Sequence, residues 1–132
     1  MPRDMSRLGS AEEWLRRARS NLALARQCGS EEVYLEDLCF EAQQAAEKAL
    51  KAVLISRRIP FRFVHDLAEL LTLLERKGIA LPDEVRLAAG LTDYSVEARY
   101  PGPFEPVTEE EFREAVRIAE AVVVWAESFI VG

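Results

Sequence analysis

The segment Cys39–Ala52, with the sequence CFEAQQAAEKALKA, decides the fold of this chain of 132 residues. Its apolar residues recur at helical spacing, so they form one stripe along a single helix. Alanines dominate that stripe, and their small side chains allow a neighbouring helix to approach closely. Glutamines, a glutamate and lysines form a second stripe beside it, at i, i+3 and i+4 spacing. The segment therefore predicts a central helix with one closely packed face.

Start and stop signals divide the rest of the chain into further helices. Capping boxes at Ser10–Glu13 and Thr108–Glu111 begin the first and the last of them. Proline and glycine residues mark most of the other boundaries, because both interrupt regular helical backbone. The predicted helices cover about 10–28, 33–56, 65–77, 82–91 with a continuation through 94–99, and 108–131.

The pattern of elements predicts the fold class. No segment shows the alternating apolar pattern and turn signals of paired strands. Short connections favour antiparallel packing of consecutive helices, so we predict an all-α, up-and-down bundle of four main helices with an additional short helix. The length fits a single helical domain at 10–131, preceded by an N-terminal tail at 1–9.

Composition and charge exclude several classes of protein. Hydrophobic residues make up 49% of the chain and charged residues 30%, which is typical of a soluble globular domain. The net charge of -6 argues against nonspecific binding to DNA. The N-terminus lacks the apolar core of a signal peptide, and the apolar stretch Ala119–Val131 contains two glutamates and is too short to span a bilayer. We therefore expect a cytoplasmic protein that does not enter a membrane.

Residues typical of metal centres and nucleophilic catalysis are scarce. The chain has two cysteines, Cys28 and Cys39, and a single histidine, His65, with no metal-ligand spacing among them. With only one histidine, no Ser-His-Asp or Cys-His catalytic arrangement can be proposed. The glycine-rich loop that binds phosphate in nucleotide-binding proteins is also absent from the sequence. We expect no metal and no cofactor. A disulfide between the cysteines stays open, although free thiols are the simpler interpretation for a reducing compartment.

Several elements, taken in order, resemble the HEPN-domain family, and in particular its small prokaryotic members. The resemblance extends from about residue 12 to residue 128. The residues that carry it are Trp14 and Ala18, Cys39-Phe40, the run Gln43–Ala49, His65-Asp66-Leu67, Tyr94, and Arg99-Tyr100-Pro101.

The resemblance implies a helical bundle that pairs as a homodimer. Small members of the family are partner subunits of a minimal nucleotidyltransferase in toxin–antitoxin-like gene pairs, and nucleotide binding has been proposed for the family. On this chain the implied nucleotide-binding candidates are Arg99 and Tyr94 at a cleft, with Lys51 and Glu47 as further candidates. The competing interpretations are an intrachain ion pair for Arg99 and a solvated i,i+4 pair for Glu47 and Lys51, worth about 0.3–0.5 kcal/mol.

The resemblance also suggests where two copies would meet. We expect the alanine face of the central helix and the apolar face of the last helix to bury the core and a dimer seam. Gln43 and Gln44 lie beside that alanine face, so they are candidates for hydrogen bonds across the seam.

Other branches of the family are ribonucleases with an Arg-x4–6-His motif. In such a motif histidine moves a proton from the ribose hydroxyl, and arginine stabilises the charge that develops on the phosphate. Here Arg99 has no histidine after it. Arg58 and His65 have the required spacing, but Pro60 lies between them and breaks the helix.

Three hypotheses about function follow. The first is a non-catalytic HEPN protein that is the homodimeric partner of a minimal nucleotidyltransferase and is also a candidate for nucleotide binding. The second is a divergent endoribonuclease that uses Arg58 or Arg99 with His65. The third is a helical interaction module without a small ligand, whose acidic last helix docks a basic partner.

Overall fold

The computed structural model describes residues 8–27, 32–63, 66–94 and 106–131. These residues form helices and connecting segments and contain no strand. The prediction of an all-α bundle with four main helices and a short additional one is therefore confirmed. The elements are α1 (Ala11–Ala25), α2 (Leu35–Ser56), α3 (Leu67–Arg76), α4 (Asp83–Arg86), the 3-10 helix η2 (Leu87–Tyr94) and α5 (Glu109–Val131).

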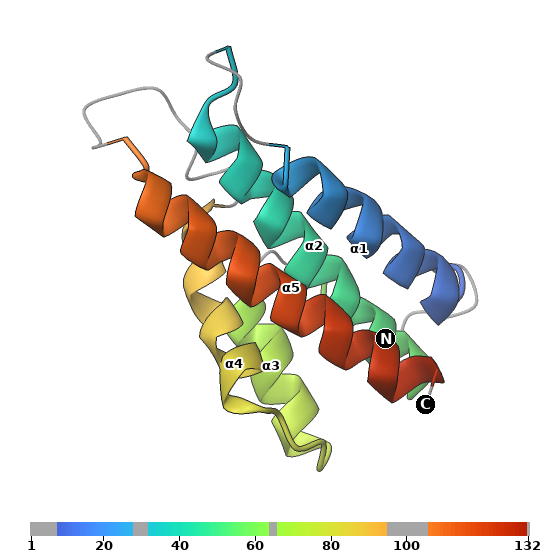
Figure 1. The fold of residues 1–132 in the computed structure, drawn as a ribbon. Coiled ribbons are helices and arrows are strands. Elements are labelled where there is room, and N and C mark those ends of the chain that lie inside the picture. The colour runs from blue at the N-terminus through green and yellow to red at the C-terminus, as the bar shows by residue number, and fades with distance from the viewer. Residues whose placement is uncertain (1–7, 28–31, 64–65, 95–105, 132) are drawn as a thin grey trace.

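Helix α2 is the centre of the fold. Figure 1 shows α1 antiparallel to α2, whereas α5 lies alongside α2 and runs in the same direction. The short elements α3, α4 and η2 gather on the other side of α5 from α1 (Figure 1). Helix α2 contacts α1, α3, η2 and α5, so neighbours cover it on most sides.

The burial of α2 explains its alanine content. Six consecutive residues, 49–54, are all buried, which requires packing partners around the whole circumference of the helix. Small side chains let those partners approach, since interior packing leaves no space for larger ones. The alanines of α2 with no exposed surface are Ala42, Ala45, Ala46, Ala49 and Ala52.

The same burial corrects the expected dimer seam. The alanine face of α2 is covered within a single chain, so it is not available to a second copy. Gln43 is also fully buried, and its side-chain oxygen accepts a hydrogen bond from Gln44 at 2.7 Å. The prediction that this face forms a contact between two copies is therefore wrong.

Local hydrogen bonds fix the helix starts where the sequence predicts them. Ser10 Oγ accepts from the Glu13 backbone N–H at 3.1 Å. In the second capping box, the Glu111 N–H donates to Thr108 Oγ1 at 3.0 Å, and the Thr108 N–H donates to Glu111 Oε1 at 2.9 Å. Asp66 caps α3 by accepting from the Ala68 N–H at 3.0 Å. These side chains satisfy backbone donors that have no partner inside the helix.

Helices α2 and α3 end in the same way but with different residues. After α3, Gly78 adopts a left-handed conformation with φ of 83°, and the Ile79 N–H donates to the Leu74 carbonyl at 3.1 Å. After α2 the left-handed residue is Arg58, with φ of 57°, where glycine would be free of steric conflict. The resulting turn directs the following chain back toward α2.

We predict that enlarging one α2 alanine destabilises the fold. Replacing Ala46 with leucine should lower the free energy of unfolding by about 1–3 kcal/mol, because the added atoms must displace packed neighbours. Urea denaturation of Ala46→Leu measures this loss. The control is Ala23→Leu on the exposed face of α1, which should change stability little. Equal effects at the two positions would contradict close packing at Ala46.

Candidate functional site

A buried polar cluster lies along α2 at the positions that the sequence offered as ligand-binding candidates. Lys51 Nζ lies 2.9 Å from Glu47 Oε2, and their side chains are only 4% and 5% exposed. Gln43 donates to the other Glu47 oxygen at 2.9 Å. The interpretation of Glu47 and Lys51 as a solvated surface pair is therefore wrong. The i,i+4 spacing does form an ion pair, but it forms it inside the protein.

Two aromatic rings lie close to the Lys51 ammonium group. Its Nζ is 5.8 Å from the centroid of the Phe61 ring and 5.6 Å from that of the Phe63 ring. The two rings contact each other edge to face, with centroids 5.8 Å apart. Both distances to Nζ fall within the range of cation–π attraction. Among the described residues, Glu47 and Lys51 thus belong to a buried polar cluster, and their opposite charges face each other.

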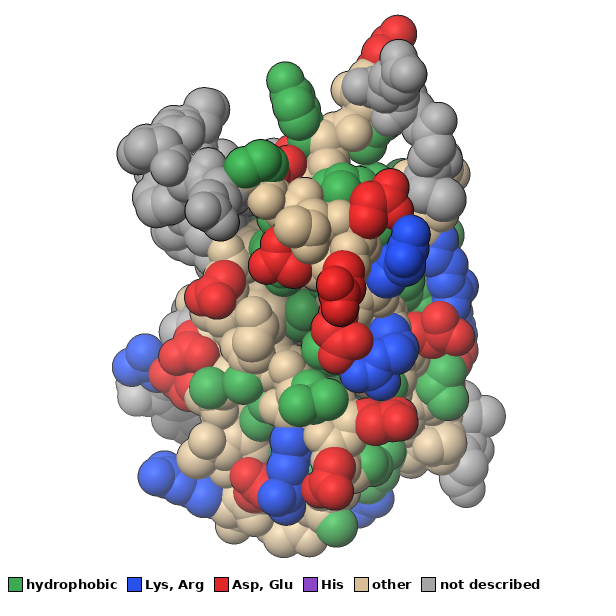
Figure 2. All heavy atoms as spheres, turned by 60° about the vertical axis from the view of Figure 1, so that its left-hand side comes forward, with side chains coloured by type: hydrophobic (Ala, Val, Ile, Leu, Met, Phe, Trp, Pro, Cys, Tyr) green, Lys and Arg blue, Asp and Glu red, His purple; other side chains and the backbone are tan. Residues whose placement is uncertain are grey.

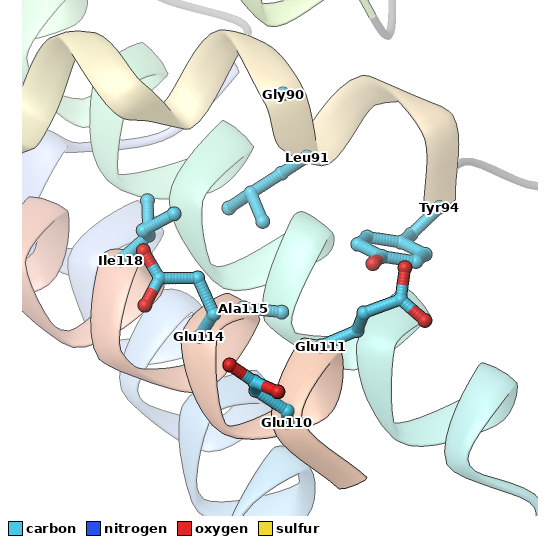
Figure 3. Close-up of a pocket in the computed structure, with 8 residues that line it drawn as sticks. All are labelled: Gly90, Leu91, Tyr94, Glu110, Glu111, Glu114, Ala115 and Ile118. Atoms are coloured by element: carbon cyan, nitrogen blue, oxygen red, sulfur yellow. The ribbon is translucent and has the colours of Figure 1, made fainter. Parts of the chain in front are cut away.

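Tyr94 lies in a different place, in a groove between η2 and α5. The groove has a volume of about 370 Å³. Figure 3 shows η2 along one side of it and α5 along the other, with the side chains of Tyr94 and Glu111 pointing toward each other at one end. The residues that line the groove are Gly90, Leu91, Tyr94, Glu110, Glu111, Glu114, Ala115 and Ile118.

The groove has an electronegative character. Three of the described residues that line it are glutamates, and none of these described residues is a lysine or arginine. The pKa of Tyr94 is raised to about 12, mainly because the phenol is partly buried and also because Cys39, Glu111 and Asp93 disfavour a second negative charge there. Tyr94 therefore keeps its hydroxyl proton at neutral pH.

The three glutamates that line the groove differ in their hydrogen-bond and ion-pair partners within the chain. Glu111 is engaged in the capping box of α5, and Glu114 is paired with Arg117 at 2.6 Å. The side chain of Glu110 makes no hydrogen bond or ion pair with the residues that the structure describes. Glu110 is thus the carboxylate most available to a ligand.

The structure separates the predicted site residues into different regions. Tyr94 lies near Cys39, whereas Lys51 is twelve residues further along α2, a distance of about 18 Å along the helix axis. Arg58 is exposed at the far end of α2. His65 and Arg99 lie outside the described residues.

The groove itself was not predicted from the sequence. The last helix is visibly rich in glutamate, but nothing in the sequence connects Glu110, Glu111 and Glu114 with η2. That connection joins residues about twenty positions apart across two elements, which no local pattern reveals. Gly90 was missed for the same reason, because a lone glycine in a sequence has several explanations.

The described residues also bear on metal and membrane binding. Residues 8–27, 32–63, 66–94 and 106–131 contain no group of three or more histidine, cysteine, aspartate or glutamate residues arranged to hold a metal ion. In the same ranges, no helix combines the length and the apolar character needed to cross a bilayer.

Comparison with known proteins identifies the family. A family model for the HEPN domain matches residues 11–129, which is most of the chain. The chain belongs to the HEPN domain family. The resemblance found in the sequence is thereby confirmed. The matched residues 11–129 nearly coincide with the range of about 12–128 over which the sequence resembles the family. No protein with a curated function matches the chain significantly.

Two solved structures share the fold of this HEPN protein. TT1696 from Thermus thermophilus is 32% identical, with a TM-score of 0.76, and the match covers 90% of this chain and 97% of TT1696. ST0689, an archaeal HEPN homologue, is 29% identical with a TM-score of 0.73, and the match covers 92% of this chain and 98% of ST0689. The similarity therefore extends over nearly the whole length of both relatives.

We predict that the Glu47–Lys51 pair is important for stability. Lys51→Met removes the positive charge facing a buried carboxylate, which should cost about 3–5 kcal/mol in unfolding free energy. The double variant Glu47→Gln/Lys51→Met should lose less than the sum of the two single variants. Urea denaturation of all three measures the coupling.

The matched control is the exposed pair of the same spacing, Glu109 and Arg113, whose charged atoms lie 3.0 Å apart. Arg113→Met should cost less than about 1 kcal/mol, because water already solvates that pair. Strictly additive effects at Glu47 and Lys51 would contradict the coupling.

We predict that Cys39 is unreactive in the folded protein. Cys39 is a free, buried thiol, and burial, together with Glu36 and Glu111, raises its pKa from 9.0 to about 12. A Cys28→Ser variant isolates it. At neutral to mildly alkaline pH its reaction with Ellman's reagent should be very slow in the folded state and rapid in urea.

The same shift has a consequence for stability. Between pH 9 and about 12 the unfolded chain loses the Cys39 proton while the folded chain keeps it, so Cys39 makes stability fall as the pH rises through this interval. Rapid labelling of the folded Cys28→Ser variant would contradict both expectations.

Proposed function

We propose that this HEPN protein is a non-catalytic, homodimeric subunit that acts by binding a protein partner, and that the partner is a minimal nucleotidyltransferase in a toxin–antitoxin-like pair. Family membership supports the choice of partner. The observation that carries the binding role is the groove beside Tyr94, which has an apolar floor and a free carboxylate at its rim. Such a surface suits a side chain of another protein better than it suits a phosphate.

Electrostatics favours a protein partner over a nucleotide at this groove. Phosphate groups are repelled by nearby carboxylates, and among the described residues the only cation paired with a carboxylate of the groove is Arg117, which holds Glu114 and leaves Glu110 and Glu111 uncompensated. Lys51 is the basic residue among the described nucleotide-binding candidates, and it is held against Glu47 in the interior. Figure 2 shows carboxylates, Lys and Arg side chains and apolar side chains interspersed over one face of the molecule.

A homodimer is part of the proposal, and its seam is proposed to lie on the outer surface of the bundle. Since the alanine face of α2 is covered by α1 and α5, the outer surfaces of the bundle must supply the contact. Exposed apolar side chains on those surfaces include Leu24 on α1 and Val124 on α5, at 46% and 55% exposure. Sedimentation velocity of the purified chain tests the dimer directly.

The partner is tested by coexpression. A tagged copy of this chain should retain a minimal nucleotidyltransferase from the same organism through size-exclusion chromatography, as one peak containing both chains. The matched control is an unrelated HEPN protein with the same tag. Elution of the two chains as separate peaks, with both folded, would contradict the proposal.

We predict no selective nucleotide effect on the melting temperature of the protein alone. A nucleotide present at 100 times its dissociation constant would add about 2.7 kcal/mol to the unfolding free energy, which thermal denaturation detects easily. The panel is measured with and without magnesium, which could screen the carboxylates. A selective shift that disappears in Arg99→Ala would contradict this prediction and establish a nucleotide site.

The non-catalytic part of the proposal has its own test. Purified protein should leave structured RNA intact over hours. Cleavage that is abolished by His65→Ala would overturn the proposal in favour of the divergent ribonuclease.

A further inference from the structure

Gly90 occupies a position in the groove where the fold does not require glycine. Its φ lies outside the left-handed range, and a Cβ added there would meet no atom within 4 Å. Glycine in a helical segment costs about 0.5–1 kcal/mol relative to alanine. Neither backbone geometry nor the packing of a Cβ accounts for this residue, which is exposed and lines the groove with open space around it.

The groove floor is apolar and its rim is acidic. Leu91, Ala115 and Ile118 form apolar parts of the lining, and Leu91 is almost completely buried. Figure 3 shows Glu111 pointing toward Tyr94 at one end of the groove, with Glu110 beside it on the first turn of α5 and further from Tyr94. A fitting ligand therefore combines an aliphatic stem with a positively charged end.

We propose that the groove between η2 and α5 binds an arginine side chain of a protein partner. This inference rests on the proposed role of the chain as a partner-binding subunit. The methylene groups of the arginine lie on the apolar floor, while the guanidinium group reaches the carboxylates of Glu110 and Glu111. Its planar face stacks on the Tyr94 ring, which gives arginine an advantage over lysine.

The surroundings indicate a protein segment as the source of this side chain. Glu110, Glu111 and Glu114 are all exposed, so the groove opens along its rim and admits a side chain that projects from a longer chain. Leu87 is 48% exposed and lies three residues before Gly90, which places both on the same side of a 3-10 helix. An apolar neighbour of the bound arginine can contact Leu87 there.

The first experiment compares two short fluorescein-labelled peptides by fluorescence anisotropy. One carries a single arginine between two leucines, and the other carries citrulline in place of the arginine, which keeps the shape but removes the charge. The arginine peptide should bind at least about tenfold more tightly, because its charge-assisted hydrogen bonds are lost in citrulline. Equal affinity of the two peptides, or no detectable binding of either, would overturn the inference.

Variants locate the binding. Gly90→Phe should fill the groove and weaken arginine-peptide binding at least about tenfold, and its open surroundings allow it to fold. Glu110→Gln should weaken binding about fivefold, since one charged acceptor is lost. The control is Glu12→Gln, at the equivalent second position of α1, which should bind like the wild type. Unchanged binding in Gly90→Phe would overturn the inference.

Two further measurements exclude other occupants. Spermidine is tested as a competitor, and displacement of the peptide at equal or lower concentration would assign the groove to a free polyamine instead. Sedimentation velocity compares the wild type with Gly90→Phe, and loss of a dimer in that variant would assign the groove to a second copy. Either result would contradict the proposal that the arginine comes from a separate protein partner.

Copurification and peptide binding together distinguish a wrong assignment of the groove from a wrong choice of partner. If the nucleotidyltransferase copurifies with wild type and equally with Gly90→Phe, the partner role stands and the groove assignment is wrong. If the arginine peptide binds as expected but no complex with the nucleotidyltransferase forms, the groove stands and the proposed partner is wrong.

Discussion

The burial of α2 on most of its circumference is the constraint on which the rest of the structure depends. Helices α1 and α5 both pack closely on α2, and the five fully buried alanines among its contact positions leave room for that approach. Burial then forces the remaining polar residues of α2 to find partners within the protein. Glu47 and Lys51 do so by facing each other, with Gln43 as a third member of the cluster.

Identical spacing leads to different outcomes in two helices. Glu109 and Arg113 on α5 have the same i,i+4 relation as Glu47 and Lys51 on α2, yet the α5 pair is exposed and the α2 pair is not. An exposed pair contributes little to stability, whereas a buried charge depends strongly on its partner. Glu47 and Lys51, two of the residues proposed from the sequence as ligand contacts, are thus buried in the interior. Exposed carboxylates lie instead on the surface beside Tyr94.

The groove beside Tyr94 is the feature that relates this fold to a binding role. It forms where η2 passes over the start of α5, so it combines a turn of 3-10 helix with the glutamate-rich first turns of a long helix. On the proposal made above, its apolar floor and acidic rim favour a cationic side chain over a phosphate group. Family membership alone would not have distinguished between these two kinds of ligand.

The sequence by itself determined the helices, their starts and the family. Those features depend on local interactions, such as the capping boxes at Ser10 and Thr108, and on a periodicity that residues close in sequence create. Only the tertiary structure decided that Glu47 and Lys51 are buried and that Gly90 and Glu110 share a groove. Burial and grooves depend on which helices pack together and at what angle, and that geometry joins residues whose separation in sequence leaves no local pattern.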